Sequence, residues 1–239
     1  MKAQERHQLK ENEFVNTVST VSGAVQEHRG TAAIVAGIVI VVAAAVGGWM
    51  YFRTQKANDA GALLGIATAM SQAPITPAPS LPGATQSPGT FPTELARSEA
   101  AIKAYTKVGE AFPGTDAAIA ATYQLGSELL LAKRPADAQQ AFHTVATSGS
   151  AFYASLARLG EAEALMALNK QDEAIKIYTD LAADRNGTLP TDGLLMELAR
   201  AAQKAGKPQD ARAAFKRVVD EFPDSGYAAD AKAQLAALK

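Results

Sequence analysis

The chain has 239 residues, no cysteine and a formal net charge of −1. Without thiols it contains no disulfide scaffold, no cysteine-based zinc site or redox centre, and no thiol nucleophile. The charge divides into +2 over residues 1–56 and −3 over the remainder, so neither part has the basic surface that nucleic-acid binding requires.

An uncharged, apolar run extends from Thr31 to Phe52 and is bounded by Arg29 and Arg53. As a helix it would be about 33 Å long, enough to cross a hydrocarbon core of roughly 30 Å. We therefore expect a leader at 1–30, a transmembrane helix at 31–52 and a further domain at 53–239. The residues expected at the membrane interface after the span are Trp49, Tyr51, Phe52 and Arg53.

A cleaved secretory signal is the alternative to an anchor, because the alanines at 43–45 would supply a small-residue processing site. Two features favour an uncleaved anchor. About thirty residues, four of them acidic, precede the run, and apolar sequence continues past the alanines to Phe52. The side of a span with more Lys and Arg residues tends to be cytoplasmic. The numbers of these residues close to the run are nearly equal on its two sides, and only counting the whole leader favours a cytoplasmic N-terminus.

Two different segments follow the apolar run. Residues 57–72 place Ala60, Leu63, Leu64 and Ala67 at helical spacing, which predicts a helix able to continue from the anchor. Residues 73–92 then contain six of the eleven prolines in the chain. Because proline fixes its own φ and lacks an amide donor, this insertion is predicted to be an extended loop that folding does not require.

From residue 93 onward the sequence predicts helices with few interruptions. The expected ranges are 93–111, 115–132, 135–148, 151–168, 171–184, 191–205, 208–221 and 225–238. Pro135 and Pro208 suit the first turn of a helix. Thr115 and Ser225 are expected to cap the helices that follow them.

Four times an alanine is followed four residues later by an aromatic residue, at steps of 37, 36 and 37 residues. The pairs are Ala101 and Tyr105, Ala138 and Phe142, Ala174 and Tyr178, and Ala211 and Phe215. This period is typical of solenoids of stacked helical hairpins, in which each unit buries its apolar face on its neighbours. A nonrepetitive helical bundle in an alanine-rich chain is the alternative.

The repeated positions resemble the tetratricopeptide pattern. The second hairpin matches best, with Leu125, Gly126, Ala138, Phe142 and Val145 in the places of that pattern. The third matches least well, because Glu161 stands in the leucine place. The resemblance implies an all-α chain, in which a transmembrane helix is followed by a tetratricopeptide-like solenoid of about four hairpins.

In such a solenoid a ligand would lie along the surface formed by the first helix of each hairpin. In the phase of the pattern, the candidate peptide-binding residues on this surface are Tyr123, Ser127, Glu163, Met196, Arg200 and Gln203. Tyrosine and methionine suit adaptable peptide contacts. A solvated helix face also carries mixed polar residues without any ligand, so the pattern leaves both interpretations open.

The sequence offers no pattern of a catalytic centre. His7, His28 and His143 form no pair at metal-ligand spacing, and His143 is expected to face solvent. Glycine-rich phosphate loops are absent. Glu161 and Glu163 lie two residues apart, on different faces of a helix, and make no acid–base pair. We expect a protein that is not an enzyme, with no cofactor, no metal and no small-molecule substrate.

The layout resembles the YfgM-type family of single-anchor ancillary subunits of the bacterial SecYEG translocon. The resemblance rests on the leader, the anchor exit from Gly48 to Arg53, the alanine-rich helix after it and the hairpins. It implies an inner-membrane protein with a cytoplasmic N-terminus and a periplasmic domain, whose partners are translocon subunits, a membrane-anchored chaperone and unfolded clients. The longer leader and the insertion depart from that family.

The last hairpin supports a second interpretation. Residues 213–235 also resemble repeats of envelope proteins that serve the Tol-Pal system, the cell wall or outer-membrane assembly. Those proteins typically reach the envelope by a cleaved signal or a lipidated cysteine. The chain has a spanning segment and no cysteine, which places this alternative second.

Overall fold

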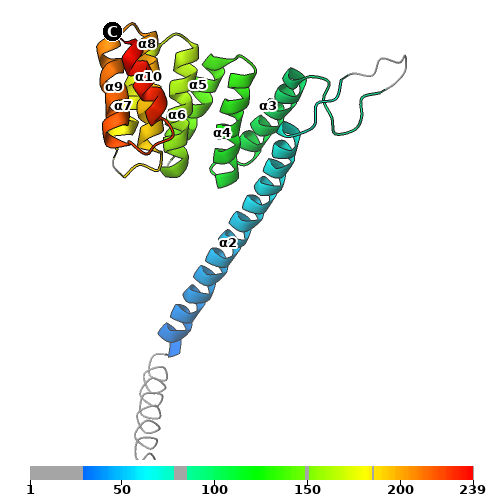
Figure 1. Cartoon of the computed structure of the whole chain (residues 1–239). Helices are drawn as coiled ribbons and strands as arrows, with labels where there is room; N and C mark the ends of the chain where they lie inside the picture. Colours follow the sequence, from blue (N-terminus) through cyan, green and yellow to red (C-terminus); the bar gives the residue numbers. More distant parts are fainter. Residues whose placement is uncertain (1–28, 78–84, 149–150, 185, 239) are drawn as a thin grey trace, which may run out of the picture. The chain divides into compact units, whose positions relative to one another are not determined.

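The computed structural model describes residues 29–77, 85–148, 151–184 and 186–238, and its regular elements are helices (Figure 1). Their bounds are α2 Arg29–Ser71, α3 Glu94–Ala111, α4 Asp116–Leu131, α5 Pro135–Ala146, α6 Ala151–Ala167, α7 Gln171–Ala183, α8 Thr191–Lys204, α9 Pro208–Glu221 and α10 Ala228–Ala237. Each bound from α3 onward lies within three residues of the predicted one. The all-α fold, with a long apolar helix ahead of a helical-hairpin solenoid, is confirmed.

Helix α2 contains the apolar run. Within the described ranges it is the helix long and apolar enough to cross a membrane: the candidate span is Ala33–Ser71, and its most apolar window of 18 residues has a mean hydropathy of 2.4. The large apolar side chains of the run are 48–73% exposed, and they are Ile34, Val35, Ile38, Val39, Ile40, Val41, Val42, Val46, Trp49, Met50, Tyr51 and Phe52. The Arg53 guanidinium lies 5.4 Å from the Trp49 ring centroid. Apart from residues 29 and 30, the predicted leader lies outside the described residues.

The chain divides into two units, Met1–Gln55 and Lys56–Lys239. The second unit begins inside α2, whose last four turns form the first helix of the first hairpin. There Ala67 packs in one apolar cluster with Ala101 and Tyr105 of α3. The hydroxyl groups of Ser71 and Tyr105 lie 3.1 Å apart. Helix α2 therefore contains both the apolar run and an integral part of the solenoid core.

The remaining helices pair in chain order. Helices α4 and α5, α6 and α7, and α8 and α9 form hairpins, and each helix from α3 to α10 packs on the next one along the chain (Figure 1). Helix α4 also contacts α6 directly, so first helices of successive hairpins meet. Helix α10 packs on α9 and closes the C-terminal end.

The core is built from the alanine–aromatic repeat. The aromatic residues Tyr105, Phe142, Tyr178 and Phe215 are 0–2% exposed, and the alanines Ala101, Ala138, Ala174 and Ala211 are fully buried. The ring of Phe142 explains why small residues are needed around it. A Cβ atom added at Gly126 would lie 2.7 Å from that ring, and one added at Gly160 would lie 2.6 Å from it. The ring therefore fills the space between α4 of its own hairpin and α6 of the next.

Of the two predicted helix caps, Thr115 is confirmed and Ser225 is not. Thr115 caps α4, because its side-chain oxygen accepts a hydrogen bond from the Ala118 amide at 3.2 Å. Ser225 does not cap the last helix, which begins only at Ala228. Its hydroxyl instead donates to Asp192 Oδ2 at 2.5 Å. The Ser225 oxygen also accepts a hydrogen bond from the Tyr227 amide at 3.1 Å, within the turn that precedes the helix. The predicted cap is wrong because the helix begins three residues after Ser225.

The described parts of the proline-rich insertion contain no helix, as its prolines predict. Its two ends are joined by an isolated bridge between Ile75 and Phe91. The Thr76 amide donates to the Phe91 carbonyl at 2.9 Å, and the Phe91 amide donates to the Pro74 carbonyl at 3.0 Å. The loop is therefore closed at its base before α3 begins.

Candidate interaction surfaces of the solenoid

The first helices α4, α6, α8 and α10 form one face of the solenoid, which we call the first-helix face. Contacts between neighbouring first helices hold it together. Lys204 Nζ of α8 donates to the Met166 carbonyl of α6 at 3.0 Å. Arg200 Nη2 of α8 donates to Asp230 Oδ2 of α10 at 3.3 Å. The residues predicted to contact a peptide lie on α4, α6 and α8 of this face.

Tyr123 and Glu163 come together where α4 meets α6. The Tyr123 ring lies 5.7 Å from the buried Phe142 ring and 6.0 Å from the Tyr153 ring, measured between centroids. Burial raises the pKa of Tyr123, and the negative charge of Glu163 raises it further. An aromatic patch therefore adjoins a carboxylate at this point of the first-helix face.

A second carboxylate lies close by on α8. Glu163 has solvent-exposed surface, yet partial burial raises its pKa, and the negative charge of Glu197 adds to the effect. The pKa of the Tyr178 hydroxyl is also raised, first by burial and then by Glu197 and Glu163. Arg200 Nη1 donates to Glu197 Oε1 at 2.7 Å and partly balances this charge. The centre of the face is thus rich in tyrosine and carboxylate groups.

The other predicted residues of this face are less available. Gln203 Nε2 donates to Gln234 Oε1 of α10 at 3.4 Å, and Ser127 is only partly exposed. Met196 is fully buried, in the apolar cluster that also contains Ala231 of α10. Met196 is therefore not accessible to a ligand. The repeat pattern predicts an exposed residue at this position because it does not include α10, the helix that closes the C-terminal end of the solenoid.

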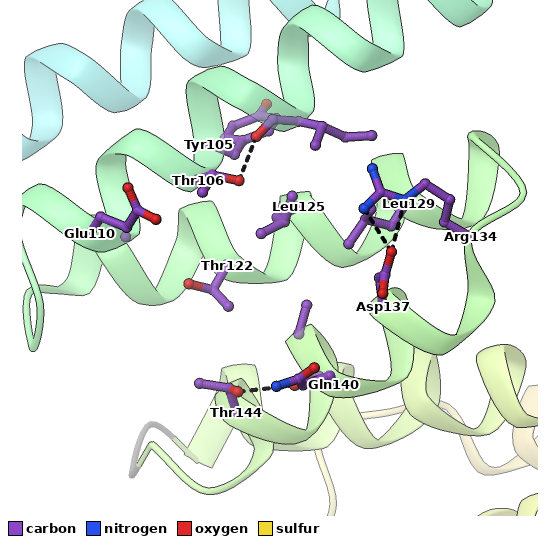
Figure 2. A pocket seen from close by; sticks show the side chains of 13 residues that line it. Tyr105, Thr106, Glu110, Thr122, Leu125, Leu129, Arg134, Asp137, Gln140 and Thr144 are labelled. Atoms are coloured by element: carbon purple, nitrogen blue, oxygen red, sulfur yellow. Dashed lines mark hydrogen bonds and ion pairs between the residues drawn. The ribbon is translucent and has the colours of Figure 1, made fainter.

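A hollow of about 540 Å³ lies between α3, α4 and α5 (Figure 2). Its apolar lining includes Leu125 and Leu129 of α4 and Ile102 of α3. A smaller hollow of about 250 Å³ shares Gly109, Thr122 and Thr144 with it and continues toward Ser148. The two together form a groove along α4, walled by the second helices of adjacent hairpins.

The polar groups of this groove are largely engaged within the protein. The hydroxyls of Thr106, Thr122 and Thr144 each donate to the carbonyl four residues earlier in their own helix, at 2.8–2.9 Å. At one end Arg134 Nε donates to Asp137 Oδ2 at 2.8 Å, as Figure 2 shows. The groove therefore offers mainly an apolar surface with threonine methyl groups.

This groove is not predicted by the repeat pattern, because its lining comes from two hairpins. The available signal was weak: the solvent-side positions 106, 109 and 144 carry threonine and glycine in place of long charged side chains. Gly160 was also missed, since it stands two residues before the place where the repeat pattern expects its small residue. Both features depend on how hairpins stack, which a single repeat does not specify.

The described residues show no cluster of three or more His, Cys, Asp or Glu side chains able to hold a metal ion. His143 is 66% exposed at its side chain, and its Nδ1 lies 3.2 Å from Glu161 Oε1. This contact joins α5 to α6 across two hairpins. Two ligands without a third do not make a metal centre.

Comparisons with known proteins agree with this geometry. Residues 194–225, which contain most of α8 and all of α9, match the tetratricopeptide repeat family. Two crystal structures of nearly identical TPR-like repeats from a protein described as a kinesin light chain of Podosopora anserina, one of them a point variant, superpose with a TM-score of 0.52. They are 16% identical to the chain over 59% of its length and 77% of theirs.

The solenoid is built of tetratricopeptide-like repeats. A crystal structure of MamA is also similar, with a TM-score of 0.46 and 16% identity over 59% of this chain and 86% of that one. No curated protein matches the sequence. Repeats of this kind present extended surfaces, which are typical of scaffolds for protein–protein interactions.

Proposed function

We propose that the chain is a non-enzymatic interaction scaffold of the bacterial inner membrane, with its leader in the cytoplasm and its solenoid in the periplasm. The continuity of α2 carries this proposal, because one unbroken helix contains both the apolar run and the first helix of the solenoid. Apolar side chains that are about half exposed are unfavourable in water and favourable in lipid. The span therefore supports a solenoid that is tethered to a bilayer.

Within this class, we propose an ancillary subunit of the SecYEG translocon that recruits periplasmic chaperones and unfolded clients. The layout of one anchor followed by hairpins supports this role. The first-helix face contributes Tyr123, Tyr153 and Arg200, and tyrosine and arginine are enriched at protein interfaces. A polypeptide emerging at the membrane is a ligand of the right kind for such a face.

Site-specific photo-crosslinking in intact cells tests the partner. A photo-reactive residue at Val41 samples the span, one at Tyr123 samples the first-helix face, and one at the exposed Ala136 of α5 serves as the control. Translocon subunits or a membrane-anchored chaperone captured from Val41 and Tyr123, but not from Ala136, are the expected result. Capture of Tol-Pal or outer-membrane assembly components would instead establish the scaffold of the second interpretation.

The absence of native cysteine allows the orientation to be tested with a single thiol. In Ala136→Cys, a membrane-impermeant maleimide should label intact spheroplasts, because α5 is expected in the periplasm. Labelling that appears only after lysis would reverse the orientation. The intact mass of the same protein should include the leader, whereas a product beginning near Val46 would show that the run is a cleaved signal.

A further inference from the structure

The groove along α4 corresponds by the repeat to the next interface between hairpins, yet the two interfaces carry different side chains. Steps of 36 and 37 residues relate four residues of the groove to four residues of that interface. The groove residues are Thr106, Thr122, Leu125 and Thr144, and their counterparts are, in the same order, His143, Arg158, Glu161 and Asp180. Three threonines and a leucine in the groove are thus replaced by four ionisable residues.

These counterparts bridge the next interface with two polar contacts. His143 Nδ1 of α5 lies 3.2 Å from Glu161 Oε1 of α6. Arg158 Nη2 of α6 donates to Asp180 Oδ2 of α7 at 3.1 Å. One repeat further along, the position of Arg158 is taken by Leu195, which is fully buried. The open, apolar groove along α4 is therefore a property of its own interface and does not follow from the repeat.

The groove has the length of a short extended peptide. Its lining extends along α4 from Ala118 to Leu129, which is about 16 Å at 1.5 Å per residue. An extended chain covers about 3.3 Å per residue, so about five residues span this length. A helix about 10 Å wide would occupy on the order of 1,200 Å³ over the same length, more than the larger hollow of about 540 Å³ holds.

The threonines of the groove suit a peptide backbone better than a hydrocarbon chain. The hydroxyls of Thr106, Thr122 and Thr144 each donate their hydrogen to a carbonyl of their own helix. Each oxygen keeps lone pairs that accept a further hydrogen bond. An extended backbone has unpaired amide groups that donate such bonds, whereas an acyl chain has no donor.

The charges around the groove add a preference. Figure 2 shows Glu110 and Arg134 on opposite sides of the larger hollow. Arg134 Nη2 lies 2.7 Å from Asp137 Oδ2, so these two charges compensate each other. Glu110 is exposed and forms no ion pair with the part of the chain that the structure describes. A basic group on the ligand would complement this free carboxylate.

We propose that the groove along α4 binds an extended apolar segment of an unfolded polypeptide, with a basic side chain beside Glu110. The proposal rests on the proposed scaffold function and adds to it a site separate from the first-helix face. Apolar side chains of the segment pack on Leu125 and Leu129, and its amide groups donate to the threonine oxygens.

Peptide binding to the full chain in zwitterionic lipid nanodiscs tests the groove. The probe is a fluorescein-labelled peptide of five valine and leucine residues flanked by lysines, and its fluorescence anisotropy is corrected with empty nanodiscs. The double variant Thr122→Arg with Thr144→Asp copies the ion pair of the next interface into the groove, so the affinity should fall at least tenfold. Ser127→Arg is the matched control on the first-helix face of the same helix, and its affinity should stay within twofold of the wild type.

The role of Glu110 is tested with the charge of the peptide. Glu110→Gln should weaken binding of the lysine peptide about two- to fivefold, the range for an exposed ion pair. A peptide with glutamates in place of the lysines should bind the wild type more weakly than the lysine peptide does. This comparison needs no variant, so it decides the point even if the double variant lowers the melting temperature. Equal affinity for the two peptides would refute the role of Glu110.

Other results would overturn the groove as a peptide site. These are an unchanged affinity in a correctly folded double variant, and no binding of the lysine peptide to the wild type. Loss of binding in Ser127→Arg alone would place the peptide on the first-helix face, which refutes the groove and leaves the proposed function intact. Native mass spectrometry reports the other occupants: a phospholipid or a second copy that is bound to the wild type and absent from the double variant would replace the peptide.

Discussion

At the scale of single residues, the contact of Phe142 with two glycines shows how the hairpins are joined. Adding one methyl group to a helical glycine ordinarily stabilises a helix by about 1 kcal/mol. At Gly160 the new Cβ would lie 2.6 Å from the Phe142 ring. We expect Gly160→Ala to destabilise the protein by roughly 1–3 kcal/mol, the range for overpacking a core. Thermal unfolding of the full chain in detergent would measure this.

Gly193→Ala is the matched control for this prediction. Gly193 also lies in a helix, but a Cβ atom there would be 3.7 Å from the Tyr227 ring, an ordinary contact. This variant should be neutral or slightly stabilising. The destabilisation by Gly160→Ala should shrink when Phe142 is replaced by leucine, because the ring that causes the clash is gone. Equal effects in both backgrounds would show that the ring is not the cause.

The carboxylate of Glu163 has a consequence for pH dependence. Burial and the charge of Glu197 raise its pKa in the folded protein. The folded state therefore holds this proton to higher pH than the unfolded state, and the free energy of unfolding falls as pH rises from 4.5 through the raised pKa. Glu163→Gln should accordingly be more stable than the wild type at pH 7.

The same comparison at low pH tests the cause. Below about pH 3 the wild-type carboxyl is protonated in both states, so its difference from Glu163→Gln should disappear. Glu110→Gln, at an exposed position of α3, controls for the loss of one surface charge. A stability gain for Glu163→Gln that persists unchanged into acid would mean that the amide forms a new contact instead of removing a charge.

At the scale of elements, short-range sequence patterns predict the positions of the helices but not the contacts that each helix makes with neighbouring hairpins. Prolines and the alanine–aromatic spacing mark where helices begin and which side is buried, because both act within one or two turns. Ser225 is not a cap because a turn separates it from α10, which begins at Ala228, and its hydroxyl links that turn to Asp192 of the preceding hairpin. Met196 failed as a surface residue because α10 covers that end of α8. The groove beside Leu125 required two hairpins at a defined spacing. These features arise from stacking, which short-range patterns do not encode.

The insertion leads to a prediction at this scale. The bridge between Ile75 and Phe91 closes the loop at its base, where Ala73 is buried. Replacing residues 78–84 by a short Gly/Ser linker should therefore leave the melting temperature almost unchanged, since changes in loop length alter closure entropy only slowly. Replacing residues 73–92 tests the stronger expectation that the whole insertion is dispensable. A large loss of stability from the shorter replacement would show that those residues pack on the solenoid.

At the scale of the whole molecule, stacked hairpins and one cooperative bundle make different predictions. In a solenoid each unit is stabilised mainly by its neighbours, so damage should remain local. Phe215 is fully buried in the apolar cluster of α8, α9 and α10. Phe215→Ala should cost roughly 3–5 kcal/mol, the range for emptying a core aromatic site. His143→Ala, at an exposed position, should change stability little.

Amide hydrogen exchange of the full chain in detergent would locate the damage from Phe215→Ala. Exchange should become faster in α6 to α10, while α3 and α4 keep their protection, because their cluster around Tyr105 shares no residue with the one around Phe215. Phe142→Ala should behave differently, since its ring touches Gly126 on one side and Gly160 on the other and so joins the two halves. Uniform loss of protection in both variants would indicate one cooperative bundle. The first-helix face would then no longer be a row of separable units, and a ligand bound at Tyr123 would be coupled to every hairpin at once.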